Sequence, residues 1–163
     1  MSPDATSRAA PGARVLGLWR RCEPLPFGRA LFGMLFGTIV PYSGSIRASV
    51  LVLEPGHAKL AMRDRRAVRN HLGSVHAVAL ANLGELTSGL AMTTALPAGV
   101  RGIVLRIECE YGKKARGPLV AESRVTVPAV TGDTDHEVRA EIRDASGAVV
   151  ATARVHWRLG LAP

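Results

Sequence analysis

One segment of the 163-residue chain is long, apolar on nearly every side and free of proline. It runs from Ser74 to Ala95 and ends before Pro97. A helix on a protein surface shows a single apolar stripe, whereas here Ala, Leu and Val occupy most of the circumference. The segment therefore predicts a buried helix, and the rest of the chain has to supply the layer that buries it.

Segments of alternating residues supply that layer. Two short ones precede the helix and are joined by Pro55-Gly56, which predicts a β-hairpin. Four more follow the helix, as in an antiparallel sheet with one covered face. The predicted inner faces hold Ile46, Ala48, Val50 and Val52; Ala58, Leu60 and Met62; Leu105, Ile107, Cys109 and Tyr111; Leu119, Ala121, Ser123 and Val125; Val138, Ala140 and Ile142; and Ala151, Ala153, Val155 and Trp157. The sequence thus predicts an α+β fold in which one long helix covers an antiparallel sheet.

The chain length suits one domain, since domains hold roughly 100 to 200 residues. Residues 1–13 are rich in Ser, Ala, Pro and Gly and predict a flexible tail. Residues 14–43 predict an N-terminal helical arm of two short helices, separated by Pro24 and Pro26. Residues 44–160 then form the domain of sheet and long helix.

Two further features bear on the setting of the protein. The longest apolar run, residues 30–40, is shorter than the roughly 20 residues that a transmembrane helix needs, so no integral membrane span is expected. A signal-peptide core is the alternative for this run, although it begins far from Met1. Two cysteines, Cys22 and Cys109, supply neither a disulfide framework nor a metal cluster. We expect a cytoplasmic protein with no metal and no cofactor.

The charge balance favours an anionic partner. Lys and Arg number 21 against 13 Asp and Glu, a net charge of +8, which attracts nucleic acid, an acidic membrane or a phosphate-bearing ligand. Aromatic residues make up only 4% of the chain, few for stacking on bases. The long helix is apolar rather than basic, unlike a helix that reads a DNA groove. Nucleic acid is therefore not expected as a partner.

The long helix carries a carboxylate that needs an explanation. At about 100° per residue, Asn82, Glu85 and Ser88 share one sector of the helix. Burying an unpaired carboxylate costs several kcal/mol. Glu85 therefore either lies at a wet edge or pairs with an arginine in a dimer contact, or it faces a cleft where it does acid–base chemistry. The helix start, with Ser74 as the expected N-cap, offers free N–H groups for an anion or oxyanion.

These residues resemble a known family. Asn70, His76-Ala77 and then Glu85, fifteen positions after the asparagine, are similar to the pattern of hotdog-fold acyl-CoA thioesterases of the phenylacetate-pathway and 4-hydroxybenzoyl-CoA type. The stretches PYSGSIRASV, RNHLGSVHAVALANLGELTSGLA and EYGKKARGPLVAE resemble an uncharacterised branch of that superfamily. The resemblance covers residues 41–159. It implies a hotdog fold, a homodimer or homotetramer, and hydrolysis of an acyl-CoA thioester across the dimer interface.

The resemblance also implies roles for single residues. Glu85 attacks the thioester carbonyl or activates a water, while the backbone N–H of Ala77 stabilises the oxyanion. Asn70 holds the carboxylate or the water from the other subunit, and His76 orients the site. Ser88 either lines the pocket or packs the helix. The family has glycine where this chain has Ala77, and the added methyl narrows the site.

Two basic clusters are the candidate sites for the phosphates of CoA. One lies between Arg63 and Arg69, and the other lies in the loop of residues 112–117. In a hotdog both flank the long helix, so they are expected to converge there. The candidate ligands are Arg66, Arg69, Lys113, Lys114 and Arg116. The alternative for each is a solvated positive surface.

Two other functions stay open. A non-catalytic module that binds acyl-CoA or lipid is favoured by Ala77, because the methyl group restricts the approach of substrate to the backbone. A hotdog dehydratase or hydratase would use His71 together with Glu85, but the loop of residues 70–73 lacks the proline usual in such enzymes.

Overall fold

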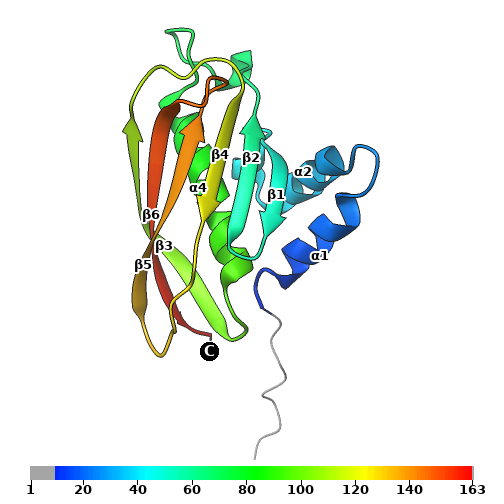
Figure 1. Cartoon of the computed structure of the whole chain (residues 1–163), viewed down its shortest axis with the longest axis vertical. Helices are drawn as coiled ribbons and strands as arrows, with labels where there is room; N and C mark the ends of the chain where they lie inside the picture. The colour runs from blue at the N-terminus through cyan, green and yellow to red at the C-terminus, as the bar shows by residue number, and fades with distance from the viewer. Residues whose placement is uncertain (1–9, 163) are drawn as a thin grey trace, which may run out of the picture.

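The computed structural model describes residues 10–162. A six-stranded antiparallel sheet wraps around one long helix, α4 (Ala77–Ala95), as Figure 1 shows. The strand order across the sheet is β1 (Ser49–Glu54), β2 (His57–Met62), β4 (Leu119–Arg124), β5 (Thr134–Arg143), β6 (Val149–Leu161) and β3 (Val100–Tyr111). This arrangement confirms the predicted α+β hotdog fold, with β1 and β3 as the two edges.

The inner faces of four strands are those predicted from alternation. Ala58, Leu60 and Met62 of β2 are buried, and so are the predicted inner residues of β5 and β6. In β4, Leu119, Ala121 and Ser123 are buried. These side chains pack against α4, which accounts for the apolar surface on most of that helix.

Strand β1 departs from the prediction because it begins at Ser49 and contains a register shift between Val50 and Val52. The extra residue of a bulge moves the following side chains to the other face. Val50 and Leu53 are therefore the buried residues of β1, and Val52 is not.

The predicted inner face of β3 is right at Ile107, Cys109 and Tyr111, which pair with the buried residues Val155, Ala153 and Ala151 of β6, but none of the three is buried. Leu105, Ile107 and Tyr111 are exposed and Cys109 is only half-buried, while a register shift lies between Val104 and Arg106. Ile103, at 64% exposure, pairs with Arg158 of β6 and lies on the outer face of the sheet. Val100 and Val104 of β3 pack in the core, whereas the apolar residues from Leu105 to Tyr111 lie at its margin on this edge strand.

Helix α4 approaches the sheet closely at Gly84. A Cβ atom at this position would lie 2.5 Å from the Cβ atom of Ala153 on β6. Glycine is required here because any side chain would push the helix away from the strand. The contact fixes the distance and the rotation of α4 relative to the sheet.

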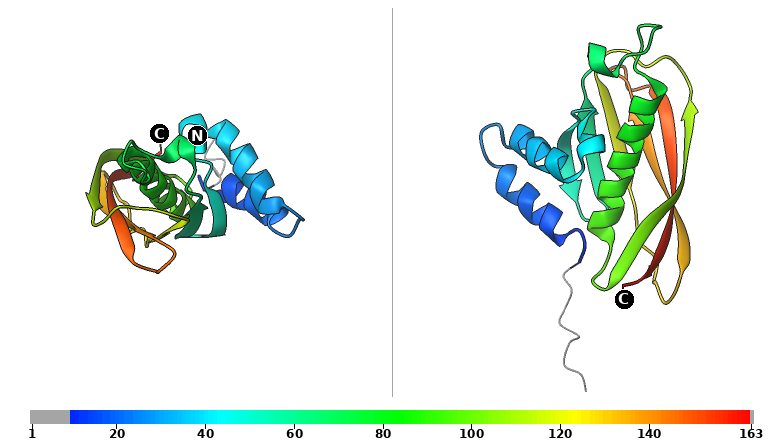
Figure 2. Two further views of the ribbon diagram at one scale, coloured as in Figure 1. Left: turned by 90° about the horizontal axis from the view of Figure 1, so that it is seen from above. Right: turned by 180° about the vertical axis from the view of Figure 1, so that it is seen from behind.

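The N-terminal arm consists of α1 (Ala13–Cys22), α2 (Gly28–Ile39) and a short third helix, α3 (Pro41–Gly44). The first two were predicted, and α3 was not. Trp19 packs edge-on against Phe32, with ring centroids 5.2 Å apart, and Phe32 stacks on Phe36. These rings join α1 and α2 to each other and to β1, on the opposite side of α4 from β3 (Figure 2).

The start of the chain is described only in part. Most of the predicted tail, residues 1–13, lies outside the described residues, and Gly12 is buried beside Thr93 of α4. Within residues 10–162, no helix combines the length and apolar character needed to cross a bilayer.

Candidate active site

Helix α4 begins three residues later than predicted, and its N-cap is His76 rather than Ser74. The Nδ1 atom of His76 accepts a hydrogen bond from Val78 N–H at 3.1 Å. Ser74 is buried, and its hydroxyl donates to Asn70 Oδ1 at 3.2 Å. The imidazole of His76 thus satisfies one of the free N–H groups at the helix start, which is a structural role.

Asn70 organises the loop that leads into α4. Its side-chain oxygen accepts hydrogen bonds from Leu72 N–H at 3.0 Å and from Ser74 N–H at 3.2 Å. The backbone N–H of Asn70 also donates to Ser74 O at 2.8 Å. Because the side-chain oxygen is occupied within its own chain, only the amide nitrogen of Asn70 is left to contact a substrate, a water or Glu85.

The N–H group of Ala77 is free at the helix start. The two preceding N–H groups are satisfied, since Val75 donates to Ala115 O at 2.9 Å and His76 donates to Val68 O at 2.8 Å. The following N–H, of Val78, donates to His76. Within the described part of the chain, nothing accepts a hydrogen bond from Ala77 N–H, and this residue is exposed. The position offers one N–H donor at the positive end of the helix dipole.

Glu85 lies in a groove of about 450 Å³ on the open side of α4. The groove is lined by Tyr42, Ser43, Val78, Ala81, Asn82, Glu85 and Ile107, which come from α3, α4 and β3. The carboxylate is half-buried, and this burial raises the pKa of Glu85. Among residues 10–162 it has neither an ion pair nor a hydrogen-bond partner. A carboxylate with a raised pKa in an apolar groove is typical of acid–base chemistry.

The two polar neighbours of Glu85 on the helix are buried. Ser88 is fully buried and its hydroxyl donates to Glu85 O at 3.0 Å, which favours helix packing over pocket lining. Asn82 is 8% exposed and donates from Nδ2 to Tyr42 O at 3.3 Å. Its Oδ1 atom is buried without a partner, the kind of acceptor that a water or a ligand N–H completes. Asn82 is therefore a site residue that the sequence placed beside Glu85 but did not assign.

The two segments that carry the basic clusters meet at a carboxylate that the prediction did not include. Asp64 binds Arg69 Nε at 2.6 Å and accepts from Gly117 N–H at 2.9 Å. The hydrogen bond from Arg69 holds the pKa of Asp64 below its usual range, and the nearby charge of Arg116 adds to this effect. Arg69 of one cluster and Arg116 of the other thus lie near the same carboxylate, although nothing in the sequence pattern marked Asp64.

Ion pairing divides the five candidate phosphate ligands. Arg69 is paired with Asp64, and Lys113 is paired with Asp144 at 2.6 Å. Arg66, Lys114 and Arg116 are exposed and form no ion pair with any described residue. Of the five candidates, these three remain available to a phosphate.

The free N–H of Ala77 and the carboxylate of Glu85 are far apart within one chain. They are eight residues apart on α4, and a rise of about 1.5 Å per residue separates them by about 12 Å along the axis. A single carbonyl group cannot contact both groups of one protomer. Within the described residues, no three His, Cys, Asp or Glu side chains gather as a metal site requires.

Comparison with known proteins identifies a family and related folds. A family model described as domain of unknown function (DUF4442) matches residues 28–159. The structure of the genomics protein APC5556 is 29% identical, covers 92% of this chain and 100% of its own, and gives a TM-score of 0.80. PA5026 from Pseudomonas aeruginosa, described as a protein of unknown function and probable thioesterase, is 25% identical over 85% of this chain and 97% of its own, with a TM-score of 0.70.

A more distant structure has the same fold. The phenylacetic acid degradation protein PaaI from Thermus thermophilus is 21% identical over 72% of this chain and 97% of its own, with a TM-score of 0.62. No curated protein matches the chain in sequence. The structural likenesses confirm the hotdog fold predicted from the sequence.

Proposed function

Because the chain belongs to the family described as domain of unknown function (DUF4442) and is similar in structure to a protein described as a probable thioesterase, we propose that it hydrolyses acyl-CoA thioesters. The observation that carries the proposal is Glu85, an unpaired, half-buried carboxylate that faces an apolar groove. Tyr42, Val78 and Ile107 form walls of this groove that suit an acyl chain.

Glu85 acts either as general base or as nucleophile. As general base it takes a proton from a water while the water oxygen bonds to the thioester carbon. As nucleophile its carboxylate oxygen bonds to that carbon, and water hydrolyses the resulting anhydride. In both routes the C–S bond breaks and CoA leaves as a thiolate. A thiol pKa of about 8.5 makes this a good leaving group that needs no strong acid.

The oxyanion is held at the start of α4. The free N–H of Ala77, at the positive end of the helix dipole, donates to the carbonyl oxygen as it gains charge. His76 positions this N–H by capping the helix, and the amide nitrogen of Asn70 contacts the water or the carboxylate. The buried Oδ1 of Asn82, one turn before Glu85, accepts a second hydrogen bond from the attacking water.

Such a site needs two copies of the chain, because Ala77 and Glu85 of one copy are about 12 Å apart. We infer that two copies pair along the edge of β3. The exposed apolar residues that flank this edge are Ile103 on the outer face, Leu105 at the bulge, and Ile107 with Val78 on the side of α4, and we call these four residues the edge surface. All four residues are exposed, and β3 is an edge strand that can accept another strand. The dimer brings Ala77 of one copy to Glu85 of the other.

The basic residues at the start of α4 bind the phosphates of CoA. Arg66, Lys114 and Arg116 are free to do so, whereas Arg69 and Lys113 exchange or share their carboxylate partners. Ser88 supports the helix at Glu85 through its bond to the backbone.

Release of free thiol from a panel of acyl-CoAs tests the proposal. We expect Glu85→Gln to lower kcat by about 100-fold to 10,000-fold, the usual contribution of a positioned general base. The matched control is Glu137→Gln, which removes an exposed carboxylate on β5 and should leave turnover unchanged.

Two outcomes would contradict the proposal. The first is full activity in Glu85→Gln. The second is tight binding of CoA esters without turnover of any acyl chain, which would identify the protein as a non-catalytic acyl-CoA-binding module. The methyl group of Ala77 is the feature that favours this second function.

A further inference from the structure

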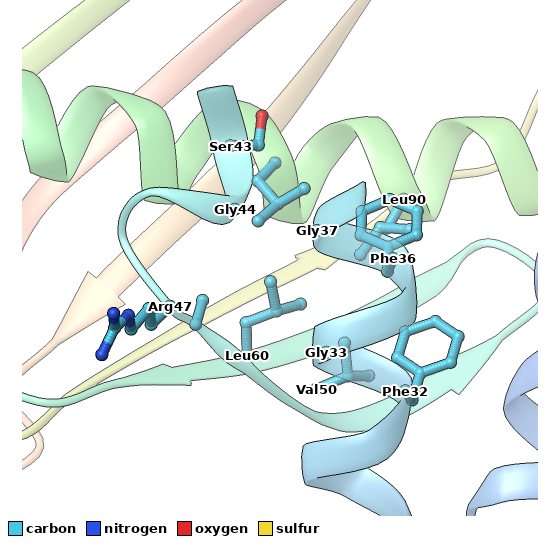
Figure 3. Close-up of a pocket in the computed structure, with 12 residues that line it drawn as sticks. Phe32, Gly33, Phe36, Gly37, Ser43, Gly44, Arg47, Val50, Leu60 and Leu90 are labelled. Atoms are coloured by element: carbon cyan, nitrogen blue, oxygen red, sulfur yellow. The ribbon is translucent and has the colours of Figure 1, made fainter. Parts of the chain in front are cut away.

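The N-terminal arm exposes a row of large apolar side chains that the proposed active site does not use. We call this row the arm face, and it consists of Leu25, Phe27, Leu31, Met34, Leu35 and Ile39. Phe27 is 90% exposed and Met34 is 63% exposed. Figure 3 shows Phe32 and Phe36 of α2 on the side that faces the body of the protein, close to Val50 and Leu90. Leu31, Met34, Leu35 and Ile39 of the arm face lie on the exposed side of the same helix, and Leu25 and Phe27 lie in the turn before it.

The exposure of Phe27 is built into the turn between α1 and α2. Phe27 is the N-cap of α2 and has a φ of 61°, in the left-handed region that residues other than glycine rarely adopt. Gly28 follows it, and a Cβ atom there would collide with Cys22 O. The turn therefore holds a bulky aromatic ring in solvent at some conformational cost, which is a feature of functional sites.

The charge around the arm face is almost entirely positive. Residues 10–53 contain five arginines and a single carboxylate, Glu23. Arg20 and Arg21 lie at the end of α1 and Arg29 lies in the first turn of α2. All three are exposed, and none forms an ion pair with another described residue.

A groove of about 780 Å³ runs along the same helix and adds to this charge. Arg29, Arg47 and Arg65 line it together with Ser45 and Ser49, and no carboxylate lines it. Met34 of the arm face lines it as well, so the groove opens beside the apolar row. Three arginines and two serines around one cavity suit a phosphate group, and Arg65 is held there by its hydrogen bond to Ser45 O at 2.7 Å.

We propose that the arm docks on an anionic phospholipid surface. Helix α2 lies in the plane of the interface with the arm face among the acyl chains, the arginines contact acidic headgroups, and the groove takes a headgroup phosphate. A helix with one apolar side and a basic rim binds membranes in this way. A second copy of the chain fits less well, because two arms facing each other would bring together two surfaces of the same positive charge.

Co-sedimentation with lipid vesicles tests the proposal on the full chain. We expect binding to vesicles that contain phosphatidylglycerol, little binding to pure phosphatidylcholine, and a loss of binding as salt is raised. Phe27→Glu/Met34→Glu should reduce binding at least about tenfold, since it places charge among the acyl chains. Arg20→Gln/Arg21→Gln should reduce it about fivefold for each arginine removed.

Matched controls change the same residue types elsewhere. Leu161→Glu places a charge on an exposed apolar residue of β6, and Arg101→Gln/Arg124→Gln removes two exposed cations of the sheet. Both should bind vesicles like the wild type. Thermal melts check that every variant is folded, and the lipid and salt dependence of the wild type needs no variant at all.

Three results would overturn the proposal. One is the absence of wild-type binding to phosphatidylglycerol vesicles, and another is equal binding to both lipids. The third is self-association that Phe27→Glu/Met34→Glu abolishes without any vesicle binding, which would make a second copy the partner of the arm face. The proposal does not depend on thioesterase activity, so failure of one leaves the other standing.

Discussion

Two exposed apolar surfaces, the edge surface and the arm face, lie on opposite sides of α4. They differ in the pairing of their backbone groups and in the charges around them. The edge surface belongs to a strand whose outer side carries unpaired backbone groups, whereas the arm face belongs to helices that satisfy their own backbone. Charges beside the edge surface are balanced, since Arg106 pairs with Glu108 and Arg154 pairs with Glu110. The arm has almost no carboxylates. Unpaired backbone groups and balanced charge therefore favour another copy of the chain as the partner of the edge surface. Positive charge and a satisfied backbone favour an anionic lipid as the partner of the arm face.

The largest expected effect comes from blocking the edge surface. Ile103→Lys/Leu105→Lys places two charges on β3 outside the groove, so we expect a monomer in light scattering. The separation of Ala77 from Glu85 then leaves the site without its oxyanion donor, and kcat should fall about 100-fold or more.

The arm variant Phe27→Glu/Met34→Glu is the counterpart in the same two assays. It should keep the mass of the dimer and its turnover of acyl-CoA in solution. A monomer of the edge variant with full activity would show that one chain holds a complete site, and a monomeric arm variant would show that the two surfaces have been assigned the wrong way round.

Salt distinguishes the interactions of the two surfaces without any mutation, because only the binding of the arm face to lipid depends on charge. Raising the ionic strength from about 0.05 M to about 0.5 M shortens the Debye length to a few Å. Binding to phosphatidylglycerol vesicles should fall at least about fivefold, the contribution of one arginine near the membrane. The mass of the dimer in light scattering should not change, because strand pairing and apolar contact hold it. A dimer that dissociates with salt would contradict the distinction.

Loss of the helix cap should have a smaller effect. His76→Ala leaves Val78 N–H without its side-chain acceptor, which costs about 1 kcal/mol. The melting temperature should fall by roughly 2–4 °C for a chain of this size. His71→Ala, in the exposed loop of the same segment, should melt like the wild type. Equal melting temperatures for both variants would contradict the role of His76 as the N-cap of α4.

The smallest expected effect is the contribution of Glu85 to the pH dependence of stability, and the sign of this contribution can be predicted. Burial raises the pKa of Glu85, so its ionised form is less stable in the folded protein than in the unfolded chain. The wild type therefore loses stability as pH rises from about 4.3 through the raised pKa, and Glu85→Gln does not. The variant should melt higher than the wild type at neutral pH and equally at acid pH.

Glu122 provides a control of opposite sign in the same melting experiment. Burial raises its pKa, but the hydrogen bond from His57 and the charge of Lys59 outweigh burial, so the pKa is lowered overall. Its ionised form stabilises the fold above about pH 4.3, and that stability is lost as pH falls through the lowered pKa. Glu122→Gln should therefore melt below the wild type at neutral pH. Equal signs for the two variants would contradict the placement of Glu85 in the groove.

Sequence patterns predicted the parts of the fold that depend on local periodicity. Alternation indicated the buried faces of β2, β4, β5 and β6 because those strands lie against α4 and have one wet side. For β3 alternation indicated the face of Ile107, Cys109 and Tyr111 but not their exposure, since alternation shows that a strand has two different faces and not which molecule covers them. It was wrong at Val52 because a bulge leaves no mark in the pattern.

The candidate site was predictable only where a residue type did not suit its local sequence. Glu85 drew attention as a carboxylate in an apolar helix, and the structure gives it a groove. Asp64 drew none, because its role depends on the loop of residues 112–117, which lies far away in sequence. The cap at His76 was missed because Ser74 is the better capping residue in isolation. Asn70 draws Ser74 into the loop instead.

The close contact at Gly84 also aims the carboxylate. Successive residues of a helix point about 100° apart, so the residue that touches β6 determines the direction of its neighbour Glu85. A methyl group at position 84 would roll the helix or lift it from the strand, and the carboxylate would swing with it. Gly84→Ala combined with Ala153→Gly moves the methyl group from strand to helix. The two residues therefore act as a complementary pair, and their contact sets the direction of Glu85 about 100° around the helix.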